Sequence, residues 1–272
     1  MAKSIVITGA TDGIGLETAR LLAADGHSLL LHGRSDEKLN RLKQELTNIP
    51  GAGTIESYRA DFSKLSEVEA FAAQIRQNHD SLDVLINNAG VFKLLDPLNE
   101  DGYDLRFIVN TIAPYVLTKR LLPLFSVQSR VVNLSSAAQA SVDLGALAGE
   151  LSLSANAAYA QSKLALTMWS FHMAQSLKND GPVIIAVNPA SFLASKMVKE
   201  AYGTQGHDLS IGAKILVRAA LGEEFAQASG QYFDNDTGQF AQPHPDALNE
   251  AKTEKLVAAI EDMIIKLNQK AP

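Results

Sequence analysis

The residues of this chain best suited to proton transfer are a tyrosine and a lysine four positions apart, Tyr159 and Lys163. On a helix, positions i and i+4 share a face, so the ammonium and the phenol can point into one cleft. A tyrosine that exchanges a proton near neutral pH needs a pKa about 3 units below its ordinary value of about 10, which is about 4 kcal/mol. One cation at about 4 Å, at an effective dielectric of about 20, supplies about that energy. The pair permits acid catalysis by tyrosine, although roughly a third of such chains contain one by chance.

A second chemical feature lies near residue 1, where an apolar strand expected at residues 4–8 runs into glycines at positions 9, 13 and 15. A helix is expected directly afterwards, over residues 16–24. Glycines let backbone N–H groups approach a pyrophosphate, and the N-terminus of a helix adds partial positive charge. The pattern predicts a dinucleotide-binding loop, with tight packing alone as the alternative.

The end of the second expected strand, residues 28–31, is followed by Arg34 and Ser35. In a dinucleotide-binding unit an acidic residue at this tip accepts from the free 2′-hydroxyl of the adenosine ribose. A guanidinium and a hydroxyl suit a 2′-phosphate instead, which favours NADP over NAD. The alternative is a surface arginine without a ligand, and Asp36 is expected to cap the next helix.

Polar side chains also follow the third, fourth and fifth expected strands. Asp61 and Phe62 follow the third strand, residues 87–90 follow the fourth, and Ser135 and Ser136 follow the fifth. The carboxyl ends of parallel strands meet at one edge of a sheet, so these loops can reach a cofactor or a substrate there. Ordinary turn chemistry is the alternative for the Asp, Asn and Gly residues.

The elements that must position these residues alternate between strand and helix. Strands are expected at 4–8, 28–31, 54–58, 84–86, 130–134, 183–187 and 231–233. Helices are expected at 16–24, 36–47, 65–77, 105–125, 156–178 and 248–267. Such repetition requires a parallel sheet with helices on each side. The expected fold class is therefore α/β, a doubly wound parallel sheet of the Rossmann type in a single domain over 1–272.

Composition limits the classes of function. The chain has 272 residues, 46% of them hydrophobic, 20% charged and none cysteine, which is ordinary for a globular protein. The net charge of −6 argues against nucleic acid or an anionic membrane as the main partner. The first strand leaves no room for a signal peptide, and no apolar run approaches membrane-spanning length, so a cytoplasmic protein is expected.

Taken in order along the chain, these motifs resemble those of the short-chain dehydrogenase/reductase family. The matches are T-G-x-x-x-G-x-G at 8–15, D-x-S at 61–63, N-N-A-G at 87–90, an asparagine at 110, a strand-end serine and Y-x-x-x-K at 159–163. The glycine spacing resembles the compact single-domain branch. Residues 105–110 and 229–233 resemble its retinol-dehydrogenase-like, NADP-using subgroup, although the N-terminal membrane anchor frequent there is not expected here.

The resemblance implies a catalytic tetrad. Tyr159 is the implied acid/base, and Lys163 is its activator and a ribose ligand. Ser136, rather than Ser135, would orient the substrate carbonyl, because the second serine of the family's N-x-S-S stretch is the catalytic one. Asn110 would hold a water in a proton relay behind Lys163. The implied contacts of the cofactor, NADP(H) in preference to NAD(H), are Gly9, Thr11, Asp12, Gly13, Ile14, Gly15, Arg34, Ser35, Asp61, Phe62, Asn88, Ala89, Gly90, Tyr159, Lys163, Pro189 and Ser195.

The family's Pro-Gly turn after the sixth strand reads Pro189-Ala190 in this chain, and Ser195 stands in for the following threonine. A β-carbon at Ala190 is tolerable only if the turn keeps φ negative. The alanine is therefore a departure from the family's pattern at the expected nicotinamide contact.

Two segments beside the expected site bear on the substrate. The interval of 23 positions between Ser136 and Tyr159 exceeds the family's usual spacing, so residues 137–155 are an expected insertion. Residues 191–209 are expected to form a mobile lid. Both segments are rich in small and apolar side chains, which predicts a small, apolar, uncharged carbonyl or alcohol substrate.

The expected activity is hydride transfer between NADP(H) and a carbonyl or alcohol, with Tyr159 as acid/base. Two alternatives stay open: an NADPH-dependent C=C (enone) reductase, and a non-catalytic NADP-binding sensor or scaffold. The long helices expected at 105–125 and 156–178 could pair across a two-fold axis, so a homodimer or homotetramer is expected from the family resemblance.

Two other patterns are interpreted as structural. The six histidines show no ligand spacing, so His27, His32 and His172 are interpreted as packing or surface residues and no metal site is predicted. Residues 234–238 resemble part of a calcium loop, but the spacing of the glycine and the twelfth position does not fit. A tight turn is expected there.

Overall fold

An eight-stranded sheet lies at the centre of the computed structural model, which describes residues 1–178, 180–191, 193 and 206–270. The strand order is β3-β2-β1-β4-β5-β6-β7-β8. The strands are β1 (Ser4–Ile7), β2 (Ser28–Gly33), β3 (Ile55–Arg59), β4 (Leu82–Asn87), β5 (Phe125–Leu134), β6 (Val183–Asn188), β7 (Gln231–Asp234) and β8 (Gln239–Ala241). All pairs are parallel except β7 with β8. The order confirms the predicted doubly wound sheet, whose switch point lies between β1 and β4.

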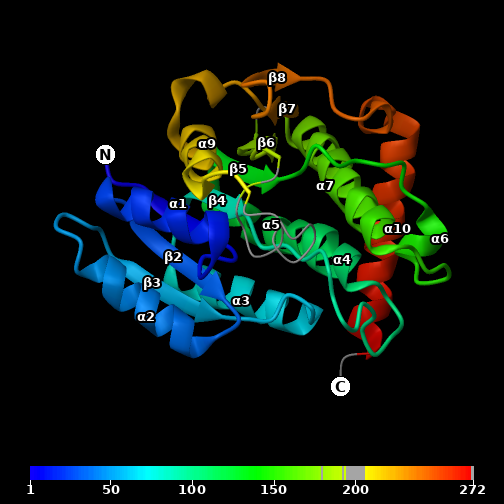
Figure 1. The fold of residues 1–272 in the computed structure, drawn as a ribbon, viewed down its shortest axis with the longest axis horizontal. Helices are drawn as coiled ribbons and strands as arrows, with labels where there is room; N and C mark the ends of the chain where they lie inside the picture. The colour runs from blue at the N-terminus through cyan, green and yellow to red at the C-terminus, as the bar shows by residue number, and fades with distance from the viewer. Residues whose placement is uncertain (179, 192, 194–205, 271–272) are drawn as a thin grey trace.

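Helices cover both faces of the sheet (Figure 1). One face carries α1 (Gly13–Ala24), α2 (Asp36–Thr47) and α9 (Leu209–Leu221). The other face carries α3 (Leu65–Asn78), α4 (Leu105–Phe107), the π-helical turn η1 (Ile108–Ile112), α5 (Ala113–Leu121) and α7 (Ala155–Leu177). The remaining described helices are α6 (Leu144–Leu147), α10 (Glu250–Lys270) and the 3-10 turns η2 (Leu122–Leu124), η3 (Glu223–Phe225) and η4 (Pro245–Leu248).

The strand sequences explain why both faces of the sheet are covered. Successive side chains of a strand point to opposite faces. In β1, Ile5 belongs to the core beneath α1 and α9, whereas Val6 belongs to the core beneath α3 and α7. Leu29 and Leu30 of β2 divide in the same way. All four side chains are 0–1% exposed, as expected of strands in which apolar and polar residues do not alternate.

Several expected boundaries were wrong. Helix α1 begins at Gly13 rather than at residue 16. The expected helix 105–125 is divided into α4, η1, α5 and η2, and β5 begins at Phe125. Pro123 in η2 has no N–H group and cannot continue an α-helix, which explains the early end. Ser35, not Asp36, caps α2, because its Oγ accepts from the backbone N–H of Lys38 at 3.3 Å.

Helix α9, strand β8 and the short helix α6 were not among the expected elements. Helix α9 packs against α1 and the sheet with an apolar face at helical spacing, formed by Gly212, Ala213, Ile215, Leu216, Ala219 and Ala220. Strand β8 contains only three residues and pairs with β7 through the tight turn expected at 234–238. The tight turn predicted at 234–238 is thus present.

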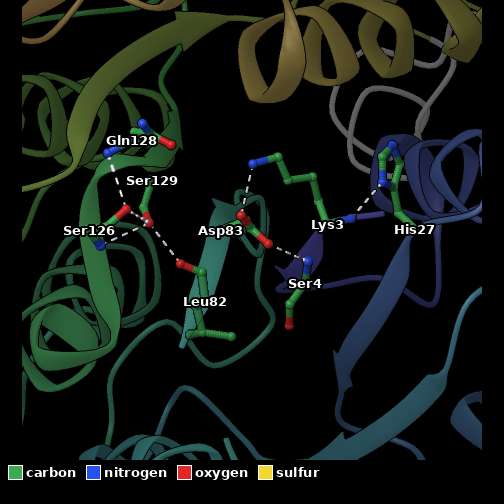
Figure 2. Close-up of polar contacts among 8 residues, drawn as sticks. All are labelled: Lys3, Ser4, His27, Leu82, Asp83, Ser126, Gln128 and Ser129. Atoms are coloured by element: carbon green, nitrogen blue, oxygen red, sulfur yellow. Dashed lines mark hydrogen bonds and ion pairs between the residues drawn. The ribbon is translucent and has the colours of Figure 1, made fainter. Parts of the chain in front are cut away.

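The amino-terminal edge of the sheet is fastened by polar contacts (Figure 2). Lys3 Nζ donates to Asp83 Oδ1 at 2.9 Å, and the backbone N–H of Ser4 donates to the other carboxylate oxygen at 2.8 Å. Ser129 Oγ donates to the backbone oxygen of Leu82 at 2.8 Å. These bonds tie β1, β4 and β5 together at the edge opposite the predicted site.

A cavity of about 390 Å³ opens at this amino-terminal edge, but none of the sequence-predicted site residues lines it. Its buried arginine, Arg130, donates through Nη1 to the backbone oxygens of Ala219 and Gly222 at 3.2 and 2.7 Å. These carbonyls end α9, so Arg130 caps that helix. Three charged residues that line the cavity, Lys3, Asp83 and Arg130, thus support the fold.

Helix α10 covers the outer side of α7 (Figure 1). Its Leu256 and Ile260 are 0–1% exposed and belong to the core beneath α3 and α7. Its Glu261 accepts hydrogen bonds from Tyr115 Oη and Lys119 Nζ of α5. Across the described residues, no helix has the length and apolarity to cross a bilayer.

Candidate active site

The glycine-rich loop is fastened to the end of β4. Thr8 Oγ1 accepts from the backbone N–H groups of Asn88 and Ala89, both at 3.0 Å. Asn88 Nδ2 donates in return to the backbone oxygens of Thr8 at 2.8 Å and Gly9 at 3.1 Å. The T-G and N-N-A-G motifs, far apart in the sequence, therefore form one unit at the carboxyl edge of the sheet.

Gly15 approaches this unit so closely that no side chain would fit. A β-carbon on Gly15 would lie 2.3 Å from the backbone oxygen of Gly9 and 2.4 Å from Asn88 Nδ2. Gly13 opens α1 with a φ of +55°, and Asp12 caps it by accepting from the Gly13 N–H at 2.8 Å. Bare backbone at a helix N-terminus fits a pyrophosphate, as the sequence predicts.

Two other predicted residues of this loop pack against neighbouring elements. The side chain of Thr11 lies over Gly33, where a β-carbon would be 2.8 Å from Thr11 Cγ2. Ile14 lies over Gly212 of α9, where a β-carbon would be 3.2 Å from Ile14 Cδ1. The side chains of both residues thus help to position the loop.

The tip of β2 carries a cation without a partner in the part of the chain that the structure describes. Arg34 is exposed, and no hydrogen bond or ion pair joins it to another described residue. Ser35 Oγ lies beside it as the cap of α2 and still has its own proton to donate. Lys38 Nζ is 3.7 Å from the Asp12 carboxylate, so this second cation is partly neutralised.

His32 contributes a contact that the sequence interpretation missed. Its ring is 2% exposed, its Nδ1 accepts from the Gly9 N–H at 3.2 Å, and its Nε2 lies 3.0 Å from the backbone oxygen of Ala60. This pattern fits a neutral ring with its proton on Nε2, and burial lowers the pKa of His32 to about 4. A polar residue inside the apolar strand 29–33 is the signal that could have revealed it.

The loop after β3 places Asp61 and Phe62 differently. Asp61 is half-buried, and its Oδ1 accepts from the Ser63 N–H at 3.0 Å. The ring of Phe62 is 3% exposed and stacks on His32 with the centroids 3.9 Å apart. The Phe62 ring therefore belongs to the core, whereas Asp61 borders the edge of the sheet.

Tyr159 and Lys163 lie on one face of α7, as their spacing predicts. Lys163 Nζ is 5.7 Å from the centroid of the Tyr159 ring, and the ring of Phe92 packs on the tyrosine with the centroids 4.6 Å apart. The lysine is 4% exposed and donates to the backbone oxygen of Leu134 at 2.7 Å. Burial lowers the pKa of Lys163 to about 8.

Asn110 lies in the π-helical turn η1 and is fixed from two sides. Its Oδ1 accepts from the Val91 N–H at 2.8 Å, and its Nδ2 donates to the Val91 oxygen and to Ser162 Oγ, both at 3.0 Å. A β-carbon on Gly90 would lie 3.3 Å from Asn110 Oδ1 and 3.6 Å from Lys163 Nζ. Asn110, Lys163 and the N-N-A-G loop therefore meet at one point, and π-turns often mark functional sites.

The two serines after β5 differ in environment. Ser135 is 3% exposed, and its Oγ is 2.7 Å from Thr167 Oγ1 of α7. Ser136 is half-buried, and its Oγ accepts only from the Ala138 N–H, at 3.1 Å, among the described residues. Tyr232 of β7 supports Ser136 by donating to its backbone oxygen at 3.1 Å. The hydroxyl of Ser136 is thus the more accessible one.

The loop after β6 contains an alanine with a positive φ, contrary to the expectation that φ is negative there. Ala190 has a φ of +117°, so the turn does not keep φ negative. Pro189 and Ser191 flank it at the carboxyl end of β6. Ser195 lies outside the described residues, as does most of the expected lid. Leu193, which is described, is 2% exposed and pairs with His207 in a short bridge.

The expected insertion 137–155 packs in part against α7 and the core. Asp143 caps α6 and accepts from the N–H groups of Gly145 and Ala146, while its own N–H donates to Gln161 Oε1 of α7 at 2.9 Å. Leu147 is 1% exposed. The apolar residues of this segment thus serve the core in part.

Comparison with known proteins agrees with this geometry. Residues 3–206 match the family model described as short chain dehydrogenase. Retinol dehydrogenase 13 of Homo sapiens is 30% identical over 277 residues, which cover 94% of this chain and 82% of the relative. Polyprenol dehydrogenase of Homo sapiens is 29% identical over 255 residues, which cover 85% and 76%.

Solved structures share the fold. An uncharacterized protein from Mycobacterium paratuberculosis is 26% identical with a TM-score of 0.79, covering 96% of this chain and 92% of its own. Pseudomonas aeruginosa RhlG in complex with NADP is 21% identical with a TM-score of 0.70, covering 86% and 95%. The chain belongs to the short-chain dehydrogenase family and is an NAD(P)-dependent oxidoreductase.

Proposed function

We propose that the protein is an NADP(H)-dependent enzyme that interconverts a carbonyl and an alcohol on a small apolar substrate. The observation that carries the proposal is the buried ammonium of Lys163 beneath the ring of Tyr159. A cation in this position favours the ionised form of a neighbouring phenol. The tyrosine can then exchange a proton with a substrate oxygen near neutral pH.

In the proposed reduction, the bound cofactor supplies the hydride. Tyr159 Oη donates the proton to the substrate oxygen, and Ser136 Oγ donates a hydrogen bond to the same oxygen as charge develops there. Lys163 holds the tyrosine in its reactive state and has two further N–H donors for the cofactor's ribose. Asn110 is held rigidly beside Lys163 and is proposed to position the water of a proton relay.

Preference for NADP(H) over NAD(H) is part of the proposal. Arg34 has no ion-pair partner among the described residues, so it is available to a 2′-phosphate. Replacing the cation in Arg34→Gln is expected to raise the KM for NADPH about tenfold or more and to leave the KM for NADH nearly unchanged.

The apolar substrate is supported by the surroundings and by the relatives. The apolar ring of Phe92 packs on Tyr159. The human relatives are named retinol dehydrogenase and polyprenol dehydrogenase, after alcohols. An alcohol or carbonyl on an apolar body is therefore the proposed substrate class, and self-association through the family's usual helices stays a prediction.

The decisive experiment measures oxidation of NADPH and NADH by the purified protein with apolar aldehydes, ketones, quinones and enones. Tyr159→Phe is measured alongside, because it removes one hydroxyl and preserves the ring packing. NADPH-dependent turnover that falls at least a hundredfold in the variant is the expected result. Near-wild-type turnover by Tyr159→Phe would refute the proposed role.

The same panel separates the alternatives. Reduction of enones without reduction of ketones would indicate a C=C reductase, in which the tyrosine protonates carbon. Tight NADPH binding without turnover on any substrate would favour an NADP-binding sensor or scaffold.

A further inference from the structure

The turn between β7 and β8, residues 235–238, forms hydrogen bonds with the loop that follows β6. The carboxylate of Asp236 accepts from the backbone N–H of Ser191 at 2.8 Å, from Ser191 Oγ at 2.6 Å and from Asn188 Nδ2 at 2.9 Å. Asn235 Nδ2 donates to the backbone oxygen of Pro189 at 3.0 Å. We call this set of bonds the loop clamp. It holds the loop on both sides of Ala190.

Ala190 is the residue that needs such a clamp. Its φ of +117° lies in a region that only glycine adopts without strain. Lys178, at the end of α7, is the one other described non-glycine residue with a positive φ. Strained backbone persists where surrounding contacts hold it, and it gathers at sites of function. The bonds to Pro189 and Ser191 are contacts of that kind.

The charge of Asp236 makes the loop clamp strong. Burial opposes its ionisation, but the bonds from Ser191 and Asn188 and the nearby His207 outweigh burial and leave the pKa of this carboxyl below its usual value. Hydrogen bonds to an ionised acceptor are roughly twice as strong as neutral ones. Asp234, the other carboxylate facing the loop, accepts from Asn188 Nδ2 at 2.8 Å.

The clamped loop lies on the catalytic side of the sheet. The N–H of Ser135 donates to the oxygen of Val187 at the end of β6, at 2.8 Å. Strand β6 is next to β5, which leads to Ser136, whereas the β2 tip with Arg34 lies three strands away from β5. A dinucleotide whose adenosine end meets the β2 tip extends across β1 and β4, so its nicotinamide end reaches the loop after β6.

We propose that Asp236 is a positioning residue, whose carboxylate holds the strained Ala190 turn against the nicotinamide end of the cofactor. This role rests on the proposed function. It predicts that loss of the carboxylate weakens binding of the whole cofactor and leaves binding of its adenosine half unchanged. It also predicts that glycine at position 190 makes the loop clamp less necessary.

The test compares the affinities of NADPH and of 2′,5′-ADP, which carries only the adenosine half, by fluorescence titration and calorimetry. The variants are Asp236→Asn, Ala190→Gly and the double substitution. Thr237→Val is the matched control, because Thr237 Oγ1 bonds only to Asp234 among the described residues. Asn235→Ser, which removes only the bond to Pro189, is measured as a milder variant in case Asp236→Asn does not fold.

The expected result is about tenfold weaker NADPH binding by Asp236→Asn, with unchanged affinity for 2′,5′-ADP and a lower kcat. In the Ala190→Gly background the same substitution should cost about twofold or less, and Asn235→Ser should weaken NADPH binding about threefold. Equal losses for both ligands, an undiminished loss in the glycine background, or no loss at all would each overturn the proposal. A wild-type protein that binds neither ligand would instead refute the proposed function and this role with it.

Discussion

Replacing His32 tests whether a buried neutral histidine holds the cofactor loop. The ring bridges the Gly9 N–H and the Ala60 oxygen beneath the stacked ring of Phe62. His32→Gln keeps a donor near the position of Nε2, and His32→Asn keeps an acceptor near the position of Nδ1. Neither variant can titrate, so both should change how stability depends on pH.

The magnitude follows from the pKa of His32, which burial lowers from 6.5 to about 4, with the hydrogen bond to Ala60 and the charge of Asp61 opposing and Arg34 assisting the shift. Above pH 6.5 the ring is neutral in both the folded and the unfolded chain. As the pH falls toward 4, the unfolded chain binds a proton that the folded chain does not, so stability is lost. The full loss is about 3 kcal/mol, and about 2 kcal/mol of it occurs between pH 7 and pH 5.

The assay is urea unfolding of wild type and both variants at pH 7, 6 and 5, together with NADPH titration. At pH 7 each variant should lose about 1–3 kcal/mol for the bond it cannot make, and the gap to wild type should narrow by about 2 kcal/mol at pH 5. His27→Gln is the control, since burial lowers the pKa of His27 too, but at the amino-terminal edge of the sheet. It should alter the pH slope and spare NADPH affinity. Parallel stability curves for wild type and His32→Gln would refute the reasoning.

Three further outcomes are expected. Gly15→Ala should weaken NADPH binding at least tenfold in a fluorescence titration, because its β-carbon would displace Gly9, whereas Gly145→Ala in α6 should not. Ser136→Ala should lower kcat about a hundredfold at unchanged melting temperature, and Ser135→Ala should instead lower the free energy of unfolding by about 1–3 kcal/mol. Ile260→Ala should lower the free energy of unfolding by about 2–5 kcal/mol in urea, measured at micromolar and at tenfold lower protein concentration, because Ile260 is fully buried in the core beside α7. A loss that depended on concentration would show an interface there.

The parts of the fold that the sequence predicts depend on local patterns. Apolar runs such as residues 29–31 identify buried strands, and their alternation with helices requires the parallel sheet. The Tyr159–Lys163 spacing places both side chains on one helix face for the same local reason. Strand order then brings the ends of β1, β4 and β5 together without further information.

What the sequence does not reveal depends on contacts between distant segments. His32 reads as one polar residue in an apolar strand, and its partners are 23 and 28 positions away. Asp236 reads as part of a tight turn, which it is, but it bonds to a loop 45 positions earlier. No local pattern carries such pairing between distant segments. Helix α9 is a different case, because its buried residues between Gly212 and Ala220 recur at helical spacing and a local pattern therefore does indicate it.

Some polar groups at the carboxyl edge of the sheet hold neighbouring loops in place, whereas others keep hydrogen-bond donors that a ligand could use. Asn110 accepts one hydrogen bond through Oδ1 and donates through Nδ2 to other parts of the protein. Asn88 donates through Nδ2 to two backbone carbonyls. Both residues therefore fix the loops around them. Lys163 donates to one protein oxygen among the described residues, although an ammonium has three donors. Burial of a cation whose N–H donors are not all hydrogen-bonded lowers the stability of the fold. Burial also disfavours the charged form, so the pKa of Lys163 falls to about 8. A fold that needed this lysine only for packing would gain from an apolar residue of similar size, so the retained charge is best explained by a ligand that completes its hydrogen bonds.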